Sequence, residues 1–77
     1  MKSEVIFGQV LKTIRKEQKI SQESLALRSD LDRTYISMLE RGIHQPTLNT
    51  LLALANALNI KASELVKIVE DEIEKNE

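Results

Sequence analysis

The sequence contains no cysteine, which excludes disulfide bridges and zinc sites built from thiolates. It has two glycines, one proline and one histidine. Neither a phosphate-binding glycine loop nor a nucleophile paired with a base can be assembled from that set, so we do not expect an enzyme. We likewise expect no metal site, no cofactor and no small-molecule ligand.

Long hydrophobic runs are missing as well. No stretch of about 18 apolar residues is present, so no segment is expected to span a membrane. The first residues, Met1–Glu4, are not followed by the long apolar stretch of a signal peptide. We therefore expect the protein to reside in the cytoplasm.

The length favours one small domain, and the net charge differs in sign between the body of the chain and its C-terminal tail. A chain of 77 residues has room for a single domain over 1–77, with a core that a partner subunit could complete. Residues 1–60 hold eight Lys and Arg against six Asp and Glu, a net charge of +2, whereas residues 61–77 hold three Lys against six acids, a net charge of -3. A mildly basic body with an acidic tail is compatible with nucleic-acid binding through one face.

Apolar side chains recur at intervals of three and four along the chain, and no strong segment alternates with a period of two. We therefore predict an all-α protein of five helices. The residues predicted to cap the helix N-termini have short polar side chains: Ser3, Ser21, Asp32, Thr47 and Ser63. The first four helices are expected to end, in order, near Lys19, Asp30, Gly42 and Asn59, and the last spans 63–75.

The fourth and fifth predicted helices each carry an apolar face. In the fourth, the residues at helical spacing are Leu48, Leu51, Leu52, Ala55 and Leu58. In the fifth, they are Leu65, Val66, Val69 and Ile73. The second set could close the core of the monomer, or it could form a two-fold interface.

The segment 21–42 contains two short capped helices separated by a turn, which is typical of a helix-turn-helix. In the second of these helices, Ile36 and Leu39 form the inward face. Three polar residues lie on the opposite face, and all are types that hydrogen-bond to bases or phosphates: Arg33, Thr34 and Ser37.

Over roughly residues 7–65, the sequence resembles the Xre-type, lambda-repressor-like DNA-binding domains. The matching stretches are FGQVLKTIRKEQKISQESLA, LDRTYISMLERG and HQPTLNTLLALANALNIKASEL. The LDRTYIS block and the short length also resemble the controller proteins of restriction–modification systems. The resemblance implies a five-helix lambda-repressor-like fold and a transcriptional regulator that binds double-stranded DNA as a homodimer on pseudo-palindromic operators.

The resemblance also implies a role for individual residues. Arg33, Thr34 and Ser37 would contact bases, with Arg33 the first choice because a guanidinium can bond two guanine acceptors. Residues implied in phosphate contacts are Gln22, Tyr35, Arg41, His44, Gln45 and Thr47. Arg41 could instead interact with a helix C-terminus, and Tyr35 could simply pack. Arg15 and Glu40 would form a structural ion pair.

The family pattern favours the fifth helix as a dimer interface, through Leu65, Val66, Val69 and Ile73. Two reading helices could then engage half-sites about 34 Å apart. Within the same fold, a phage-type repressor and the antitoxin of a toxin–antitoxin pair remain alternatives. A protein-interaction module that has lost DNA binding is a further alternative, which would predict acidic or apolar residues in place of Arg33, Thr34 and Ser37.

Overall fold

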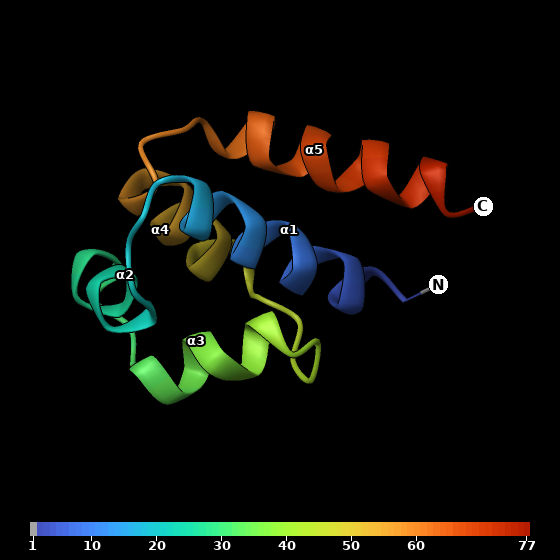
Figure 1. Ribbon diagram of the computed structural model, residues 1–77. Coiled ribbons are helices and arrows are strands. Elements are labelled where there is room, and N and C mark those ends of the chain that lie inside the picture. Colours follow the sequence, from blue (N-terminus) through green and yellow to red (C-terminus); the bar gives the residue numbers. More distant parts are fainter. Residues whose placement is uncertain (1) are drawn as a thin grey trace.

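The computed structural model describes residues 2–77, and these residues form five helices and no strand. The helices are α1 (Ser3–Glu17), α2 (Gln22–Ser29), α3 (Arg33–Glu40), α4 (Leu48–Ala57) and α5 (Ala62–Lys75) (Figure 1). The prediction of an all-α protein of five helices is confirmed. None of the helices in this part of the chain is long and apolar enough to cross a membrane.

Three of the predicted N-caps are confirmed. Ser21 Oγ accepts a hydrogen bond from the backbone N–H of Ser24 at 3.0 Å, and Thr47 Oγ1 accepts one from the N–H of Thr50 at 3.1 Å. The carboxylate of Asp32 accepts from the N–H of Thr34 at 3.4 Å. These side chains satisfy donors that have no partner within the first turn of a helix.

Two predicted caps are wrong, because Ser3 and Ser63 lie inside their helices. The N-cap residues are Lys2 and Lys61, both in an extended conformation. At α5 a side chain of the first turn bonds back to the cap residue. The carboxylate of Glu64 accepts a hydrogen bond from the backbone N–H of Lys61 at 3.4 Å. A short polar side chain at the cap is therefore not required there.

The first four helices are each followed by a residue in the left-handed conformation. Gly42 has φ 75°, and Lys19, Asp30 and Asn59 have φ between 57° and 59°. In each case the chain reverses within one or two residues of the last helical residue, as expected for this type of helix end. The predicted ends at these four positions are confirmed.

Every helix contributes at least one apolar side chain to the core. The largest side chains with less than 2 % exposure are Ile6, Leu11, Leu25, Ile36, Leu39, Leu54, Leu58 and Leu65. On α4, however, two of the leucines predicted to share an apolar face are exposed, Leu48 by 70 % and Leu52 by 48 %. A helix turns by about 100° per residue, so these two lie to one side of the stripe that faces the core.

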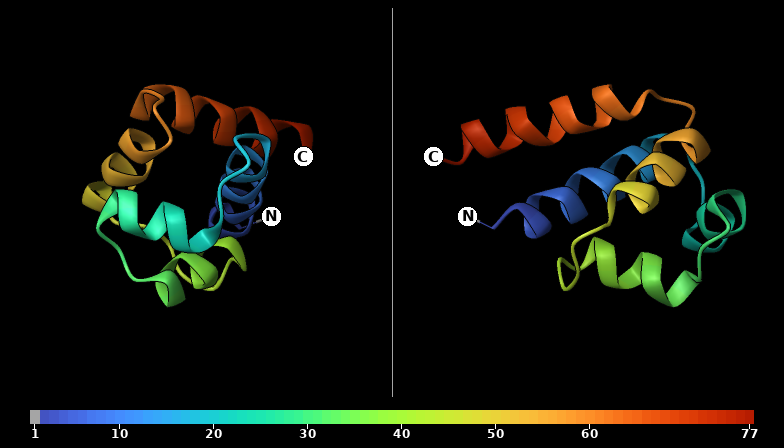
Figure 2. Two further views of the ribbon diagram at one scale, coloured as in Figure 1. Left: turned by 60° about the vertical axis from the view of Figure 1, so that its left-hand side comes forward. Right: turned by 180° about the vertical axis from the view of Figure 1, so that it is seen from behind.

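The arrangement of the helices separates α3 from α5. All three views place α3 at one side of the molecule and α5 at the opposite side, with α1 between them (Figures 1 and 2). The helix α4 forms a flank of the molecule, in contact with both α2 and α5. The outward face of α3 is thus free of any other helix.

Candidate nucleic-acid interface

The turn between α2 and α3 is short and is anchored to the core. It consists of the three residues Asp30–Asp32, which join Ser29 to Arg33. The N–H of Leu31 bonds to the carbonyl oxygen of Ala26 at 2.9 Å, and the Leu31 side chain packs against the core. This arrangement confirms the helix-turn-helix predicted for the segment 21–42.

The outward face of α3 is polar. Ile36 and Leu39 are fully buried, whereas Arg33 and Thr34 are exposed and Ser37 is half-buried. Within residues 2–77, the side chains of Arg33, Thr34 and Ser37 make no hydrogen bond or ion pair with another side chain. Their donors and acceptors are therefore available to a ligand on the outer side of the helix from Arg33 to Ser37.

The structure brings Arg15 and Glu40 together in a two-pronged ion pair. Arg15 Nε lies 2.6 Å from Glu40 Oε2, and Arg15 Nη2 donates to Glu40 Oε1 at 3.0 Å. The side chains are only 10 % and 2 % exposed. The hydrogen bonds that Arg15 donates to the Glu40 carboxylate raise the pKa of Arg15, against the opposing effect of burial. The pair joins the end of α1 to the end of α3.

Two further contacts extend this pair toward α2. Arg15 Nη1 donates to the carbonyl oxygen of Ile20 at 2.9 Å, and the Gln22 side-chain amide donates to Glu40 Oε1 at 3.0 Å. Gln22 is the first residue of α2. Its side chain, expected to contact a phosphate, is thus held by Glu40 through one of its amide hydrogens, and the other hydrogen remains for a ligand.

The other residues expected at phosphates fall into two groups. Arg41 and His44 are exposed, and Tyr35 is half-buried with its ring centroid 6.3 Å from that of His44. The side chains of Gln45 and Thr47 are engaged within the protein. The Gln45 amide donates to Glu4 Oε1 at 3.3 Å, and the Thr47 hydroxyl, besides capping α4, donates to Thr50 Oγ1 at 3.0 Å.

The four residues expected at a dimer interface on α5 differ in how far the monomer exposes them. Leu65 has no exposed surface, because its side chain fills the core of the monomer. Val69 and Ile73 are half-buried and pack against that core, whereas Val66 is 46 % exposed. A fully buried side chain adds no area to a contact with a partner subunit.

Sequence reasoning missed the role of Gly8. A Cβ atom at this position would collide with the carbonyl oxygen of Leu39 and would lie 2.8 Å from that of Glu40. The backbone of α1 therefore lies directly against the C-terminal end of α3. The only signal in the sequence was an isolated glycine inside a helical pattern, which costs about 1 kcal/mol relative to alanine.

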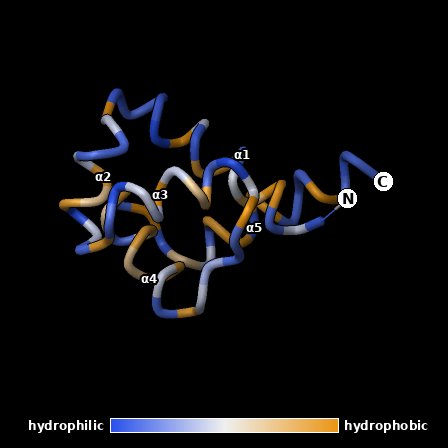
Figure 3. The backbone as a smooth tube through the Cα atoms, turned by 90° about the horizontal axis from the view of Figure 1, so that it is seen from below, coloured by the Kyte–Doolittle hydropathy of each residue, from blue (hydrophilic) through white to orange (hydrophobic). Residues whose placement is uncertain are grey.

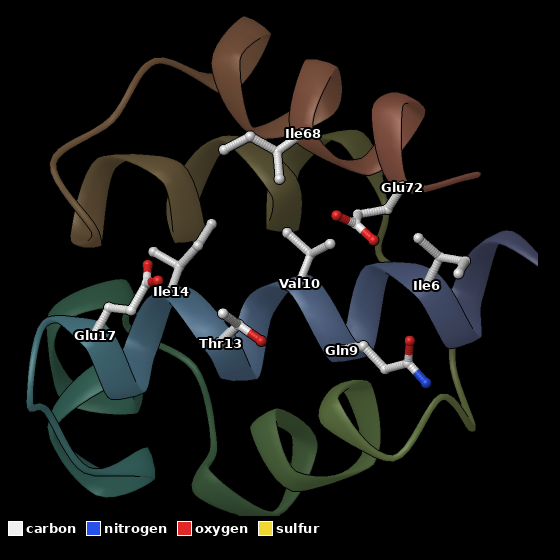
Figure 4. Close-up of a pocket in the computed structure, with 8 residues that line it drawn as sticks. All are labelled: Ile6, Gln9, Val10, Thr13, Ile14, Glu17, Ile68 and Glu72. Atoms are coloured by element: carbon white, nitrogen blue, oxygen red, sulfur yellow. The ribbon is translucent and has the colours of Figure 1, made fainter. Parts of the chain in front are cut away.

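A groove of about 330 Å³ separates α1 from α5, and no pattern in the sequence indicated it. Val10 and Ile14 of α1 point toward Ile68 of α5 across this groove, and Glu17 and Glu72 line it as well (Figure 4). The groove lies on the α5 side of α1, away from the outward face of α3. It does not belong to the helix-turn-helix surface.

The geometry above is that of a known family. Residues 11–65 match the family described as helix-turn-helix, and the chain belongs to this family of DNA-binding regulators. Its five-helix arrangement is the lambda-repressor-like fold.

Two relatives and one solved structure show where the chain stands within the family. It is 45 % identical over 67 residues to the control protein C.MunI of a Mycoplasma species, covering 86 % of this chain and 90 % of that protein. It is 46 % identical over 59 residues to the immunity repressor protein of Bacillus phage phi105, covering 77 % of this chain but only 41 % of the repressor. The crystal structure of the restriction–modification controller protein C.Esp1396I, a tetramer in complex with its natural 35-base-pair operator, aligns with a TM-score of 0.86 at 33 % identity, covering 95 % of this chain and 96 % of that one.

Proposed function

We propose that this protein is a transcriptional regulator of the restriction–modification controller type, which binds pseudo-palindromic double-stranded DNA as a dimer. The observation that carries the proposal is the outward face of α3, on which Arg33, Thr34 and Ser37 are free of partners within the described chain. The alignment over nearly the full length of a control protein supports the controller type over a phage repressor, of which the chain spans less than half.

In the proposed complex, α3 enters the major groove. Arg33, at the start of α3, bonds to the O6 and N7 acceptors of a guanine, and Thr34 and Ser37 contact neighbouring base edges. Gln22, Arg41 and His44 bond to phosphates on either side, which positions the helix without reading sequence. Tyr35, Gln45 and Thr47 complete the phosphate-facing rim. The protein acts in the cytoplasm, requires no cofactor and catalyses no reaction.

Replacing Arg33 with alanine is expected to remove most of the preference for the cognate site. Each lost pair of guanine bonds lowers discrimination by about 1–3 kcal/mol, and a dimer loses two. Weak, salt-sensitive binding to unrelated DNA should persist, because it depends on phosphate contacts. The measurement is fluorescence anisotropy on duplexes selected from a random library, against scrambled duplexes. Arg28→Ala on α2, also exposed, is the matched control. Undiminished specificity in the Arg33 variant would disprove its role as the reading residue.

Replacing Arg41 with alanine is expected to weaken binding to selected and scrambled duplexes by the same factor. Arg41 is exposed immediately after α3, where it can reach a phosphate. The slope of log affinity against log salt concentration should fall by about one unit per protomer, as for the loss of one phosphate contact. Lys67→Ala, on α5, should leave the slope unchanged. An unchanged slope for Arg41→Ala would mean that Arg41 contacts no phosphate and interacts only with the C-terminus of α3.

A further inference from the structure

Apolar side chains line the middle of the groove between α1 and α5. Val10 and Ile14 project into it from α1, and Ile68 projects into it from α5 (Figure 4). Ile68 is 39 % exposed, although its side chain is large and apolar. The groove is thus a concave surface with an apolar lining, which is the usual character of a site for a small molecule.

A carboxylate lies toward each end of this apolar strip. Along the groove, Glu17 lies beyond Ile14, and Glu72 lies on the far side of Val10 (Figure 4). The axis of α1 rises by about 10 Å from Glu17 to Val10, so the two carboxylates belong to opposite ends of the strip. No lysine or arginine is among the described residues that line the groove. A ligand with an apolar middle and a positive charge at each end matches this arrangement.

The charges around the groove also favour a cationic ligand. Helix α5 contains five acidic residues and two lysines, a net charge of -3, and the residues that follow it are hydrophilic (Figure 3). Within residues 2–77, Glu17 forms no ion pair. Glu72 pairs with Lys75 at 3.3 Å, but the two side chains are 41 % and 71 % exposed. An exposed pair of this kind contributes little, so a ligand cation can replace Lys75 at small cost.

The size of the groove favours a small molecule over a segment of another protein. Its volume of about 330 Å³ is close to the lower limit of small-molecule sites, about 300 Å³. A helix with its side chains is about 10–12 Å across and would rest on the rims of the groove. An extended aliphatic chain is much thinner. Three bonds of such a chain span about 3.8 Å, so two nitrogens separated by about eight methylene groups can reach both carboxylates.

We infer that the groove between α1 and α5 binds a linear aliphatic diamine. One ammonium group pairs with Glu17 and the other with Glu72, and the methylene chain packs against Val10, Ile14 and Ile68. The ligand bridges two helices of the folded chain, so its binding raises the stability of the fold by mass action. This site is separate from the outward face of α3, and its occupation does not depend on the proposed DNA complex.

The test is a titration of the protein with diaminooctane, without DNA, followed by NMR of the valine and isoleucine methyl groups. The signals of Val10, Ile14 and Ile68 should shift in a saturable way, and the melting temperature should rise. Octanedioate has a chain of similar length with a carboxylate at each end, and it should cause neither effect. Spermidine should bind more weakly than diaminooctane, because its central ammonium group would lie over the apolar strip.

Variants of the two carboxylates locate the binding site. Glu17→Gln and Glu72→Gln should each raise the dissociation constant by about threefold to fivefold, the value of one exposed ion pair. Lys75→Ala removes the competing partner of Glu72 and should lower the dissociation constant. The matched control is Glu70→Gln, which removes the same charge from α5 at an exposed residue outside the groove. At about 0.15 M salt its distant charge is largely screened, and binding should not change.

Three results would overturn the inference. They are the absence of a saturable shift with diaminooctane, equal binding of octanedioate, and unchanged binding by the double variant Glu17→Gln, Glu72→Gln. A helical peptide with an apolar face between two lysines that displaces diaminooctane at lower concentration would assign the groove to a protein partner instead. None of these results affects the proposed function, because the groove is not part of the helix-turn-helix surface.

Discussion

Replacing Glu40 with alanine is expected to lower the free energy of unfolding by about 3 kcal/mol, because it leaves a buried guanidinium without its counter-ion. The Arg15 side chain is 10 % exposed and would keep only the carbonyl oxygen of Ile20 as an acceptor. The Gln22 amide would lose its partner as well. For a domain of this size, each kcal/mol shifts the melting temperature by about 4–8 °C. Thermal unfolding followed by circular dichroism, at a fixed protein concentration, measures the change.

Two comparisons make this result specific to the buried pair. The double variant Arg15→Met, Glu40→Leu should regain most of the lost stability, since an apolar pair of similar volume removes the unpaired charge. Asp71→Ala breaks the exposed pair between Lys67 and Asp71, and it should leave the melting temperature unchanged. If the melting temperatures of Glu40→Ala and Asp71→Ala are equal, the Arg15–Glu40 pair is effectively solvated and does not stabilise the fold.

Replacing Gly8 with alanine is expected to destabilise the protein by about 2–3 kcal/mol, although alanine is the better helix former. The added Cβ atom would meet the carbonyl oxygens of Leu39 and Glu40, which belong to backbone and cannot rotate away. Helix α1 would have to move away from the end of α3. Urea unfolding at constant m-value measures the loss.

The sign of the effect at Gly8 distinguishes two explanations. Helix propensity alone would make Gly8→Ala more stable by about 0.5–1 kcal/mol. Gln9→Ala is the matched control, because its side chain is exposed on the same turn of α1 and it should change stability little. An increase in stability for Gly8→Ala would mean that α1 and α3 separate without cost.

Features that depend on local chemistry could be predicted from the sequence. The helices follow from the spacing of apolar residues such as Phe7, Val10 and Leu11. The N-termini of three helices follow from cap side chains that can accept a hydrogen bond from the first turn. The outward polar face of α3 follows from the same periodicity. These patterns extend over one or two turns, so each can be recognised without knowledge of the rest of the fold.

Features that depend on how the helices pack could not be predicted in this way. Leu48 and Leu52 share an apolar pattern with buried residues of α4, yet the core covers only part of that face. The spacing of Leu65 fits a dimer interface as well as a monomer core. Which of the two buries it depends on the position of α5 against the other helices. The bond from Gln22 to Glu40 spans 18 residues, and no spacing rule connects them. The pairing of Arg15 with Glu40 was expected only from the family resemblance.

The bonds that join Arg15, Ile20, Gln22 and Glu40 have a consequence for the DNA. They tie the start of α2 to the end of α3, so the phosphate-facing and base-facing parts of the proposed interface cannot shift independently. Any mismatch between this fixed spacing and a straight duplex must then be absorbed by bending or twisting of the DNA. Base pairs that the protein never touches would contribute to site preference through their deformability, with flexible pyrimidine–purine steps favoured wherever the duplex has to bend.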